Sequence, residues 1–251
     1  GVDILLIDSA HGFSKWVIEA TKYISQNYKR IALISGSVAT AAGAKALIDA
    51  GAEGLRVGMG PGSICTTRIV TGMGVPQITA VLETVAVAKQ FGVPVISDGG
   101  LRFSADLVKA MAAGASTVMS GSLFAGCDET PGKLIIKNGP PATPGEAWRA
   151  GQKYKSYRGM GSIEAMKEGS AARYGQEYRK GQEKKLIAEG VEGLVPYKGK
   201  LEDLIARLVG GIRSGMYYLG VENIPQLQEK TRFIRITPAS LIESHPHDII
   251  F

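Results

Sequence analysis

Cysteine, histidine and long apolar stretches are scarce in this sequence. Its 251 residues include two cysteines, Cys65 and Cys127, which are too few for the disulfide framework of a small secreted domain. No apolar run approaches the ~18 residues that a membrane-spanning helix needs, and no charged-then-apolar leader precedes the first apolar segment. We therefore expect a cytoplasmic protein without a membrane partner.

The net positive charge of the chain comes from one segment. The formal net charge is +6, and between Lys137 and Lys200 there are 13 Lys and Arg against seven Glu and no Asp. A local excess of this kind suits an anionic small molecule, a mobile loop or a solvated surface better than a duplex-tracking face. Because no nucleic-acid motif accompanies it, we expect no nucleic-acid partner.

Five short apolar segments alternate with helical patterns through the first half of the chain. Nearly continuous apolarity is typical of strands buried on both faces of a parallel sheet. Each segment ends in Gly, Ser or Asp, and ligands of α/β folds bind at the carboxyl ends of strands, so we expect functional residues there. The predicted strands are residues 2–8, 30–38, 54–59, 93–100 and 116–122, and the predicted helices are residues 14–28, 39–52, 78–92 and 104–115.

These units are compatible with two α/β folds. Five are too few to close a (β/α)₈ barrel by themselves, and they could also form an open doubly wound sheet. The stretch GMGPGS does not supply the dinucleotide pattern G-x-G-x-x-G, because Ser63 stands at the third glycine. Residues 131–193 are rich in Gly, Pro and charge, so we predict loop there, and an excursion of about 60 residues is typical of a functional lid. An amphipathic helix follows it.

The stretch GMGPGSICTTR, residues 58–68, places Cys65 in a loop without apolar periodicity. A structural cysteine is normally buried among apolar neighbours, whereas backbone N–H groups of such a loop could stabilise a thiolate or an anion. Taken alone, the loop leaves a reactive and an inert cysteine equally open. Further along, Asp98, Gly121 and Ser122 follow the fourth and fifth predicted strands, where barrels bind phosphate and where a carboxylate suits ribose hydroxyls. These features together indicate a nucleotide substrate.

Taken in chain order, the motifs resemble the inosine monophosphate dehydrogenase family. The resemblance runs from IDSAHG near the start to ESHPHD near the end. GMGPGSICTTR is similar to the family's cysteine loop, SDGG and MSGS to its phosphate loops, YRGMGS to its base-binding loop and ARYGQ to its flap pair. The implied fold is a (β/α)₈ TIM barrel, of which this chain supplies about strands four to eight, an active-site flap and a C-terminal tail.

The resemblance implies that residues 1–251 are the C-terminal part of a single catalytic barrel domain. Residues 1–130 would hold the βα units, residues 131–193 the flap and base-binding loop, and residues 194–251 the last helix and the tail. The N-terminal barrel strands and the regulatory cystathionine-synthase-type (CBS) modules would lie outside this chain. An open five-stranded sheet exposes an unpaired edge, so we expect the chain to need the N-terminal half of its barrel.

The implied activity is the NAD-dependent oxidation of inosine monophosphate (IMP) to xanthosine monophosphate (XMP), the committed step of guanine nucleotide synthesis. Cys65 would attack the hypoxanthine ring and form a covalent thioimidate that water hydrolyses. Arg173 and Tyr174 would activate that water, with Thr67 as a helper. Because an arginine is rarely neutral, the alternative is that Arg173 only anchors the flap.

The same positional match gives the binding residues. Those for the substrate are Ser63, Gly100, Gly121, Ser122 and Tyr157 around the phosphate, Asp98 at the ribose, and Gly159, Met160, Gly161 and Glu189 around the purine. Those for NAD are Asp8, Ser9, Gly58 and Gly60, although Asp8 could instead cap a helix.

A potassium ion and a homotetramer are also implied. Carbonyl groups of Gly60, Gly62 and Cys65 would bind the ion together with Glu243, Ser244 and His245 of a neighbouring subunit. Zinc at the segment 245–248 is a poor alternative, because two histidines without a cysteine or a third histidine make an incomplete tetrahedral set.

Other functions remain as alternatives. The sibling enzyme guanosine monophosphate (GMP) reductase shares the barrel and the thiol but uses NADPH and generally lacks a long flap with an Arg–Tyr pair. A non-catalytic nucleotide-binding module and a flavin-binding barrel are further possibilities. Two features depart from the dehydrogenase pattern: residues 140–151 look longer than usual, and Gly175 follows the flap pair where a bulky residue is common. Flap closure is therefore the least transferable inference.

Overall fold

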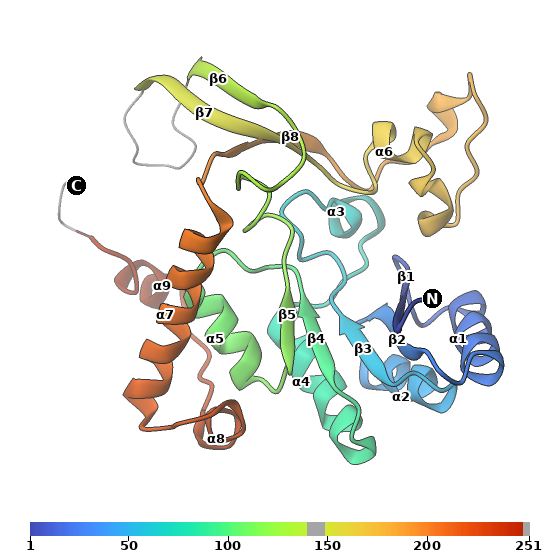
Figure 1. Ribbon diagram of the computed structural model, residues 1–251, viewed down its shortest axis with the longest axis horizontal. Coiled ribbons are helices and arrows are strands. Elements are labelled where there is room, and N and C mark those ends of the chain that lie inside the picture. Colours follow the sequence, from blue (N-terminus) through green and yellow to red (C-terminus); the bar gives the residue numbers. More distant parts are fainter. Residues whose placement is uncertain (140–148, 248–251) are drawn as a thin grey trace.

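A five-stranded parallel sheet carries the strand ends on which the site is expected (Figure 1). The computed structural model describes residues 1–139 and 149–247. The strand order is β1-β2-β3-β4-β5, so each strand lies beside its neighbour in the sequence. A doubly wound sheet would reverse this order at a switch point, so the expected α/β fold of TIM-barrel type is confirmed over the doubly wound alternative. The strands are β1 (Ile4–Asp8), β2 (Ala32–Val38), β3 (Gly54–Val57), β4 (Val95–Asp98) and β5 (Thr117–Met119).

Helices connect the successive strands, as the apolar periodicity predicts. The main core lies between these helices and the sheet, where Leu47, Leu55 and Val81 are fully buried. Burying side chains of this kind stabilises the fold by roughly 1.5–3 kcal/mol each and fixes where the strands end. The connecting helices are α1 (Lys15–Asn27), α2 (Ala41–Asp49), α4 (Gln77–Ala88) with the 3₁₀ turn η1 (Lys89–Phe91), and α5 (Ser104–Ala112). A short helix that the sequence did not indicate, α3 (Thr67–Thr71), lies between β3 and α4.

The parallel sheet has two open edges, β1 and β5. On β1, Ile4 is 62% exposed, and Val2 just before it is 59% exposed. An edge strand with uncovered apolar side chains is a surface that pairs readily with another strand.

A second, antiparallel sheet corrects the expectation of loop in residues 131–193. Its strands are β6 (Leu134–Gly139), β7 (Arg149–Arg158) and β8 (Glu192–Pro196), in the order β6-β7-β8. The composition misled because β7 buries charge: Lys155 is 4% exposed, and its Nζ donates to the carbonyls of Cys127 and Thr130. Residues 140–148, most of the stretch expected to be long, lie outside the described residues.

The part of the chain between β7 and β8 folds on a small core of its own. We call residues 163–186 the flap segment. It contains α6 (Ile163–Lys167) and the 3₁₀ turns η2 (Ser170–Tyr174) and η3 (Glu183–Lys185), packed around Met166, Ala171 and Leu186. In Figure 1, α3 lies between the parallel sheet and this upper layer of α6 and β6–β8. The loops after the parallel strands therefore face the flap segment.

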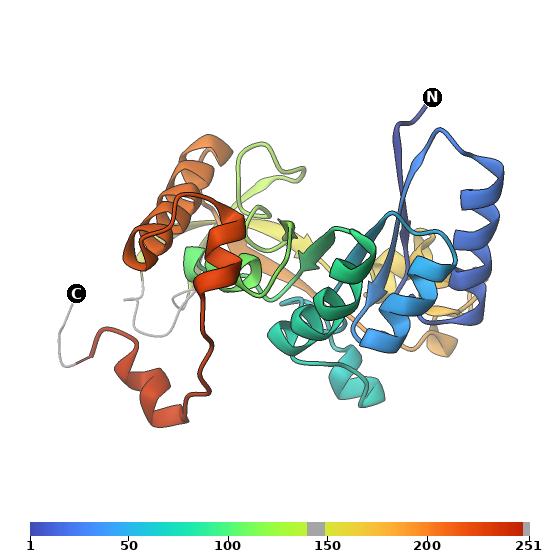
Figure 2. The same ribbon diagram turned by 90° about the horizontal axis from the view of Figure 1, so that it is seen from below.

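Three helices follow β8. The first, α7 (Leu201–Leu219), confirms the predicted amphipathic helix, because Leu204 and Leu208 pack with α5 in a second core. The others are α8 (Ile224–Lys230) and α9 (Pro238–Glu243). The helix α9 and the strand β1 lie on opposite sides of the molecule (Figures 1 and 2). Within the described ranges, no helix is both long and apolar enough to cross a bilayer.

Candidate active site

One pocket of about 360 Å³ opens at the carboxyl ends of β3, β4 and β5. Its walls come from the loops after these strands, from the end of β7, from the flap segment and from the segment before β8. The pocket gathers seventeen of the residues singled out from the sequence. They are Gly58, Gly60, Gly62, Ser63, Cys65, Thr67, Asp98, Gly100, Gly121, Ser122, Tyr157, Gly159, Met160, Gly161, Arg173, Tyr174 and Glu189.

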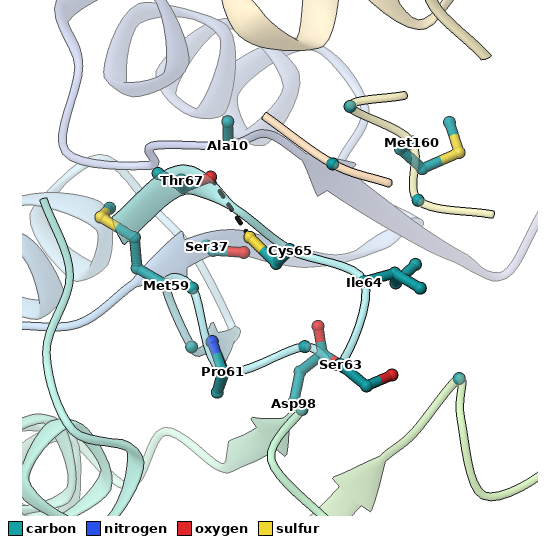
Figure 3. A pocket seen from close by; sticks show the side chains of 18 of the residues that line it. Ala10, Ser37, Met59, Pro61, Ser63, Ile64, Cys65, Thr67, Asp98 and Met160 are labelled. Atoms are coloured by element: carbon teal, nitrogen blue, oxygen red, sulfur yellow. Dashed lines mark hydrogen bonds between the residues drawn. The ribbon is translucent and has the colours of Figure 1, made fainter. Parts of the chain in front are cut away.

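The thiol of Cys65 lies inside this pocket and is half-buried, whereas Cys127 is fully buried. Its Sγ is 3.2 Å from Oγ1 of Thr67, to which it donates (Figure 3). Figure 3 shows Ser63 and Asp98 on one side of the sulfur and Met160 on the other. The geometry favours the reactive cysteine over the inert one, because the sulfur faces polar groups and open space.

A hydrogen-bonded chain continues from Cys65 to a carboxylate. Thr67 donates its one hydroxyl proton to Oε2 of Glu189 at 2.9 Å and accepts from Cys65. A proton can therefore pass from the thiol through the hydroxyl to the carboxylate. Sequence reasoning placed Glu189 at the purine and missed this link, which joins residues 122 positions apart.

Backbone bonds fix the cysteine loop on both sides. The N–H of Thr66 donates to the carbonyl of Glu189 at 2.9 Å, and the N–H of Val191 donates to the carbonyl of Ile64 at the same distance. On the other side, Nη2 of Arg68 donates to the carbonyls of Met59 and Val75, at 3.0 and 2.6 Å. The first two bonds tie the cysteine loop to the segment that carries Glu189, and the Arg68 bonds tie it to the residues on either side of α3.

Close packing shapes the expected phosphate region. A Cβ built on Gly121 would clash with the hydroxyl of Tyr157, so a larger residue here would displace the phenol where β7 meets the loop after β5. Burial raises the pKa of Tyr157, and the charge of Asp98 raises it further. The phenol therefore stays protonated at neutral pH and can donate a hydrogen bond to an anion.

The flap pair, Arg173 and Tyr174, lines the pocket, and an ion pair of Arg173 links it to the end of β1. Arg173 forms an ion pair with Oδ2 of Asp8, and its carbonyl accepts from the N–H of Ala10 at 3.4 Å. Desolvation disfavours the charged guanidinium, but the hydrogen bond and charge of Asp8 outweigh it and raise the pKa of Arg173. While this pair persists, it favours the protonated guanidinium and ties the flap segment to the end of β1. Burial likewise raises the pKa of Tyr174, against the lowering effect of Arg173.

The glycine after the flap pair has a conformational reason. Gly175 ends η2 with φ of 66°, in the left-handed region that side chains disfavour. Glycine in place of the family's bulky residue thus suits the tight turn that follows Tyr174.

Two predicted NAD residues, Asp8 and Ser9, lie beside the pocket rather than in its walls. The hydroxyl of Ser9 donates to the carbonyl of Gly36 at 2.7 Å, and the carboxylate of Asp8 is 44% exposed. Asp8 could accept ribose hydroxyls, but it already holds Arg173. A bound dinucleotide and the docked flap would therefore compete for the same carboxylate.

The six expected potassium ligands form two separate groups. Gly60, Gly62 and Cys65 belong to one loop, and backbone carbonyls are a donor type that suits a large monovalent cation. Glu243, Ser244 and His245 lie at the end of α9, in a different part of the chain (Figure 1). Only the first group adjoins the pocket. Across residues 1–139 and 149–247, no group of three or more His, Cys, Asp and Glu is arranged to hold a metal, and Asp248 of the zinc alternative lies outside them.

Sequence reasoning missed Arg56 and Ser37, which also line the pocket. Arg56 is 8% exposed and bridges Asp8 and Asp98. A signal was present: GLRV is an apolar strand interrupted by one arginine, and a buried charge needs a partner. Ser37 carried no such signal.

Comparison with known proteins shows the family of this chain. A family model described as "IMP dehydrogenase / GMP reductase domain" matches residues 1–247. The chain is 52% identical over 250 residues to inosine-5'-monophosphate dehydrogenase of Aquifex aeolicus, covering 99% of this chain and 48% of that protein. It is 53% identical over 251 residues to the protein of the same name from Rhodopirellula baltica, covering 99% of this chain and 44% of that protein.

A solved structure is similar in both sequence and shape. It is a crystal structure of a cysteine-to-alanine variant of GMP reductase from Trypanosoma brucei in complex with guanosine 5'-monophosphate. The TM-score is 0.86 and the identity 44%, over 99% of this chain and 48% of that chain. The chain thus spans about half the length of the relatives that it matches. With its five-stranded sheet and its cysteine loop, the chain belongs to the IMP dehydrogenase/GMP reductase domain family.

Proposed function

We propose that the protein containing this chain oxidises IMP to XMP with NAD⁺ through a covalent intermediate on Cys65, the committed step of guanine nucleotide synthesis. The observation that carries the proposal is the thiol of Cys65 in one pocket with Thr67, Glu189 and the Arg173–Tyr174 pair. The dehydrogenase relatives support the assignment.

Different residues of the pocket would bind the ribose, the phosphate and the purine of the nucleotide. Asp98 would accept the ribose hydroxyls, while Tyr157 and the loop amides near Gly121 would donate to the phosphate. The remaining phosphate residues are Ser63, Gly100 and Ser122, and the purine would lie against Gly159, Met160, Gly161 and Glu189.

The thiol does the covalent work. Cys65 Sγ forms a bond to C2 of the purine as its proton passes through Thr67 toward Glu189, and a hydride leaves C2. Water then adds to C2, the S–C2 bond breaks, and the sulfur takes back a proton. The overall balance is IMP, NAD⁺ and water giving XMP, NADH and a proton.

NAD⁺, when bound, supplies the hydride acceptor. Asp8, Ser9, Gly58 and Gly60 would hold it, and Asp8 is open enough to do so once Arg173 withdraws. After hydride transfer, the return of Arg173 and Tyr174 would close the pocket over the bound purine and position water. Because Asp8 keeps Arg173 protonated in the docked arrangement, base duty would require that pair to loosen.

A potassium ion would be held by carbonyls of Gly60, Gly62 and Cys65, with Glu243, Ser244 and His245 of a second copy. An ion shared in this way would join neighbouring copies, as the proposed homotetramer requires. The exposed edge strand β1 supports the proposal that the fold also requires the N-terminal half of the barrel. The proposed location of the assembled enzyme is the cytoplasm. A preparation of residues 1–251 alone that was monomeric and melted cooperatively would overturn the requirement for more strands.

The second candidate is GMP reductase, which the similarity to the Trypanosoma brucei structure favours. The flap segment with its Arg173–Asp8 contact favours the dehydrogenase. Absorbance of the reduced nicotinamide distinguishes the two activities. The full protein should form NADH when it is mixed with IMP and NAD⁺, and it should not consume NADPH when it is mixed with GMP and NADPH. The reverse result would establish the reductase.

A further inference from the structure

Arg56 is a buried arginine whose role the preceding assignment leaves open. Its side chain is 9% exposed, yet it lines the pocket. A charge this far from water persists only when it is paired. Its partners end two other strands: Nε and Nη2 donate to Oδ2 of Asp98 at 2.9 and 2.6 Å, and Nη1 donates to Oδ1 of Asp8.

The register of the sheet explains how one side chain reaches both carboxylates. Asp8 lies opposite Gly36 of β2, and Gly36 lies opposite Arg56 of β3. A Cβ on Gly36 would lie 2.8 Å from Cβ of Arg56 and closer still to its carbonyl oxygen. The glycine therefore permits the close approach that sets Arg56 between Asp8 and Asp98.

The two carboxylates differ in what else they bind. Asp98 is 18% exposed and faces the pocket, and Arg56 uses only its Oδ2 atom. Asp8 accepts from Arg56 at Oδ1 and from Arg173 of the flap segment at Oδ2. The four side chains form a row of alternating charge, Asp98–Arg56–Asp8–Arg173, that runs from the substrate pocket to the flap segment.

We propose that Arg56 is a positioning residue that couples substrate recognition at Asp98 to flap docking at Asp8. The inference rests on the proposed function, in which Asp98 binds the ribose of the nucleotide. When Arg173 neutralises Asp8, Arg56 is left to pair with Asp98 and to orient its Oδ1 atom for the ribose. When Arg173 withdraws, Asp8 draws the guanidinium away from Asp98. Substrate binding and flap docking then favour each other, because such coupling is reciprocal.

The test measures this coupling in the full protein. All variants carry Cys65→Ala, so that IMP binds without reacting, and the dissociation constant is measured by calorimetry. Arg173→Gln should raise the dissociation constant for IMP on the order of fivefold when Arg56 and Asp8 are intact. The same change should have no effect in an Asp8→Asn background, which removes the link. It should also have none with Arg56→Lys, whose single ammonium cannot hold two carboxylates as a planar fork does.

Controls separate coupling from loss of fold or of charge. Arg179→Gln removes an equal charge from the same segment, where the side chain is 77% exposed, and should leave IMP affinity unchanged. If Arg56→Lys does not fold, the Asp8→Asn background decides the question alone. An equal effect of Arg173→Gln in every background, or no effect in the parent, would overturn the coupling. A parent protein that binds no IMP would overturn the proposed function as well.

Discussion

The loops after β3, β4 and β5 and the flap segment line the same pocket, but different contacts hold them in place. The loops continue from strands of the main core, and glycines allow backbone and side chains to meet closely, as at Gly121 and Tyr157. The flap segment packs on its own small cluster and meets β1 through the Arg173–Asp8 pair and one backbone hydrogen bond to Ala10.

The difference separates a rigid half of the site from a releasable half. Segments with few buried contacts to the rest of a protein open at low free-energy cost, whereas core-anchored loops do not. We therefore expect substitutions in the loops to impair substrate binding, and substitutions in the flap segment to impair mainly the step that follows hydride transfer, with only the smaller effect on IMP affinity that the coupling through Arg56 predicts.

The largest effect is expected from the flap segment. Arg173→Ala should slow hydrolysis of the intermediate by about 10²- to 10³-fold, because water loses its activating and anchoring group. The first turnover of NADH formation should change little, since the thiol and the binding loops remain. Stopped-flow absorbance after mixing with IMP and NAD⁺ separates the burst from the steady state.

The matched control is Arg179→Ala, which removes an exposed arginine of the same segment and should leave both phases intact. Equal loss of burst and steady-state rates in Arg173→Ala would contradict the division between the two halves.

A smaller effect is expected from the packed loops. Gly121→Ala forces a methyl group against the hydroxyl of Tyr157, and overpacking of this kind costs about 1–3 kcal/mol. Because the clash displaces the Tyr157 hydroxyl from the expected phosphate region, the KM for IMP should rise by up to the same free energy, about 5- to 150-fold. Steady-state kinetics of Gly121→Ala and of Gly193→Ala, where nothing lies within 4 Å of the new methyl group, provide the comparison. Equal KM values for the two variants would show that the close approach is not needed.

The smallest effect is expected from the Tyr157 hydroxyl itself. Tyr157→Phe should raise the KM for IMP about three- to tenfold, which corresponds to the roughly 1 kcal/mol that a single hydrogen bond typically contributes. Burial and then Asp98 raise the pKa of Tyr157 above its usual value of 10.0, so the phenol keeps its proton through the neutral and mildly alkaline range. The ratio of the two KM values should accordingly stay constant from about pH 7 to about pH 9. A ratio that falls to one at the alkaline end would mean that the hydroxyl had ionised.

The parallel sheet was predictable because its signals are local. The five strands and their connecting helices follow apolar runs and periodicity, and the order of the motifs is enough to identify the cysteine loop, Asp98 and Gly121. The roles of these residues remain predictions, and so does the assignment of residues 131–193 as the flap and base-binding loop of the domain.

The remainder depends on contacts between residues far apart in the sequence. The sequence of β7 predicts loop because its lysines and glycine suppress an apolar pattern, while the strand is stabilised by pairing and by the burial of Lys155. The Thr67–Glu189 link and the Arg56 bridge connect segments that only the fold brings together. No periodicity in one sequence reports such pairs.

The most direct test of the account is mass spectrometry of the acid-quenched full protein after mixing with IMP and NAD⁺. We expect a nucleotide adduct on the peptide that contains Cys65, more of it in Arg173→Ala, and none in Cys65→Ala. NADH formation with an unmodified Cys65 under every quench time, or an adduct on the buried Cys127 instead, would contradict the covalent role of the thiol.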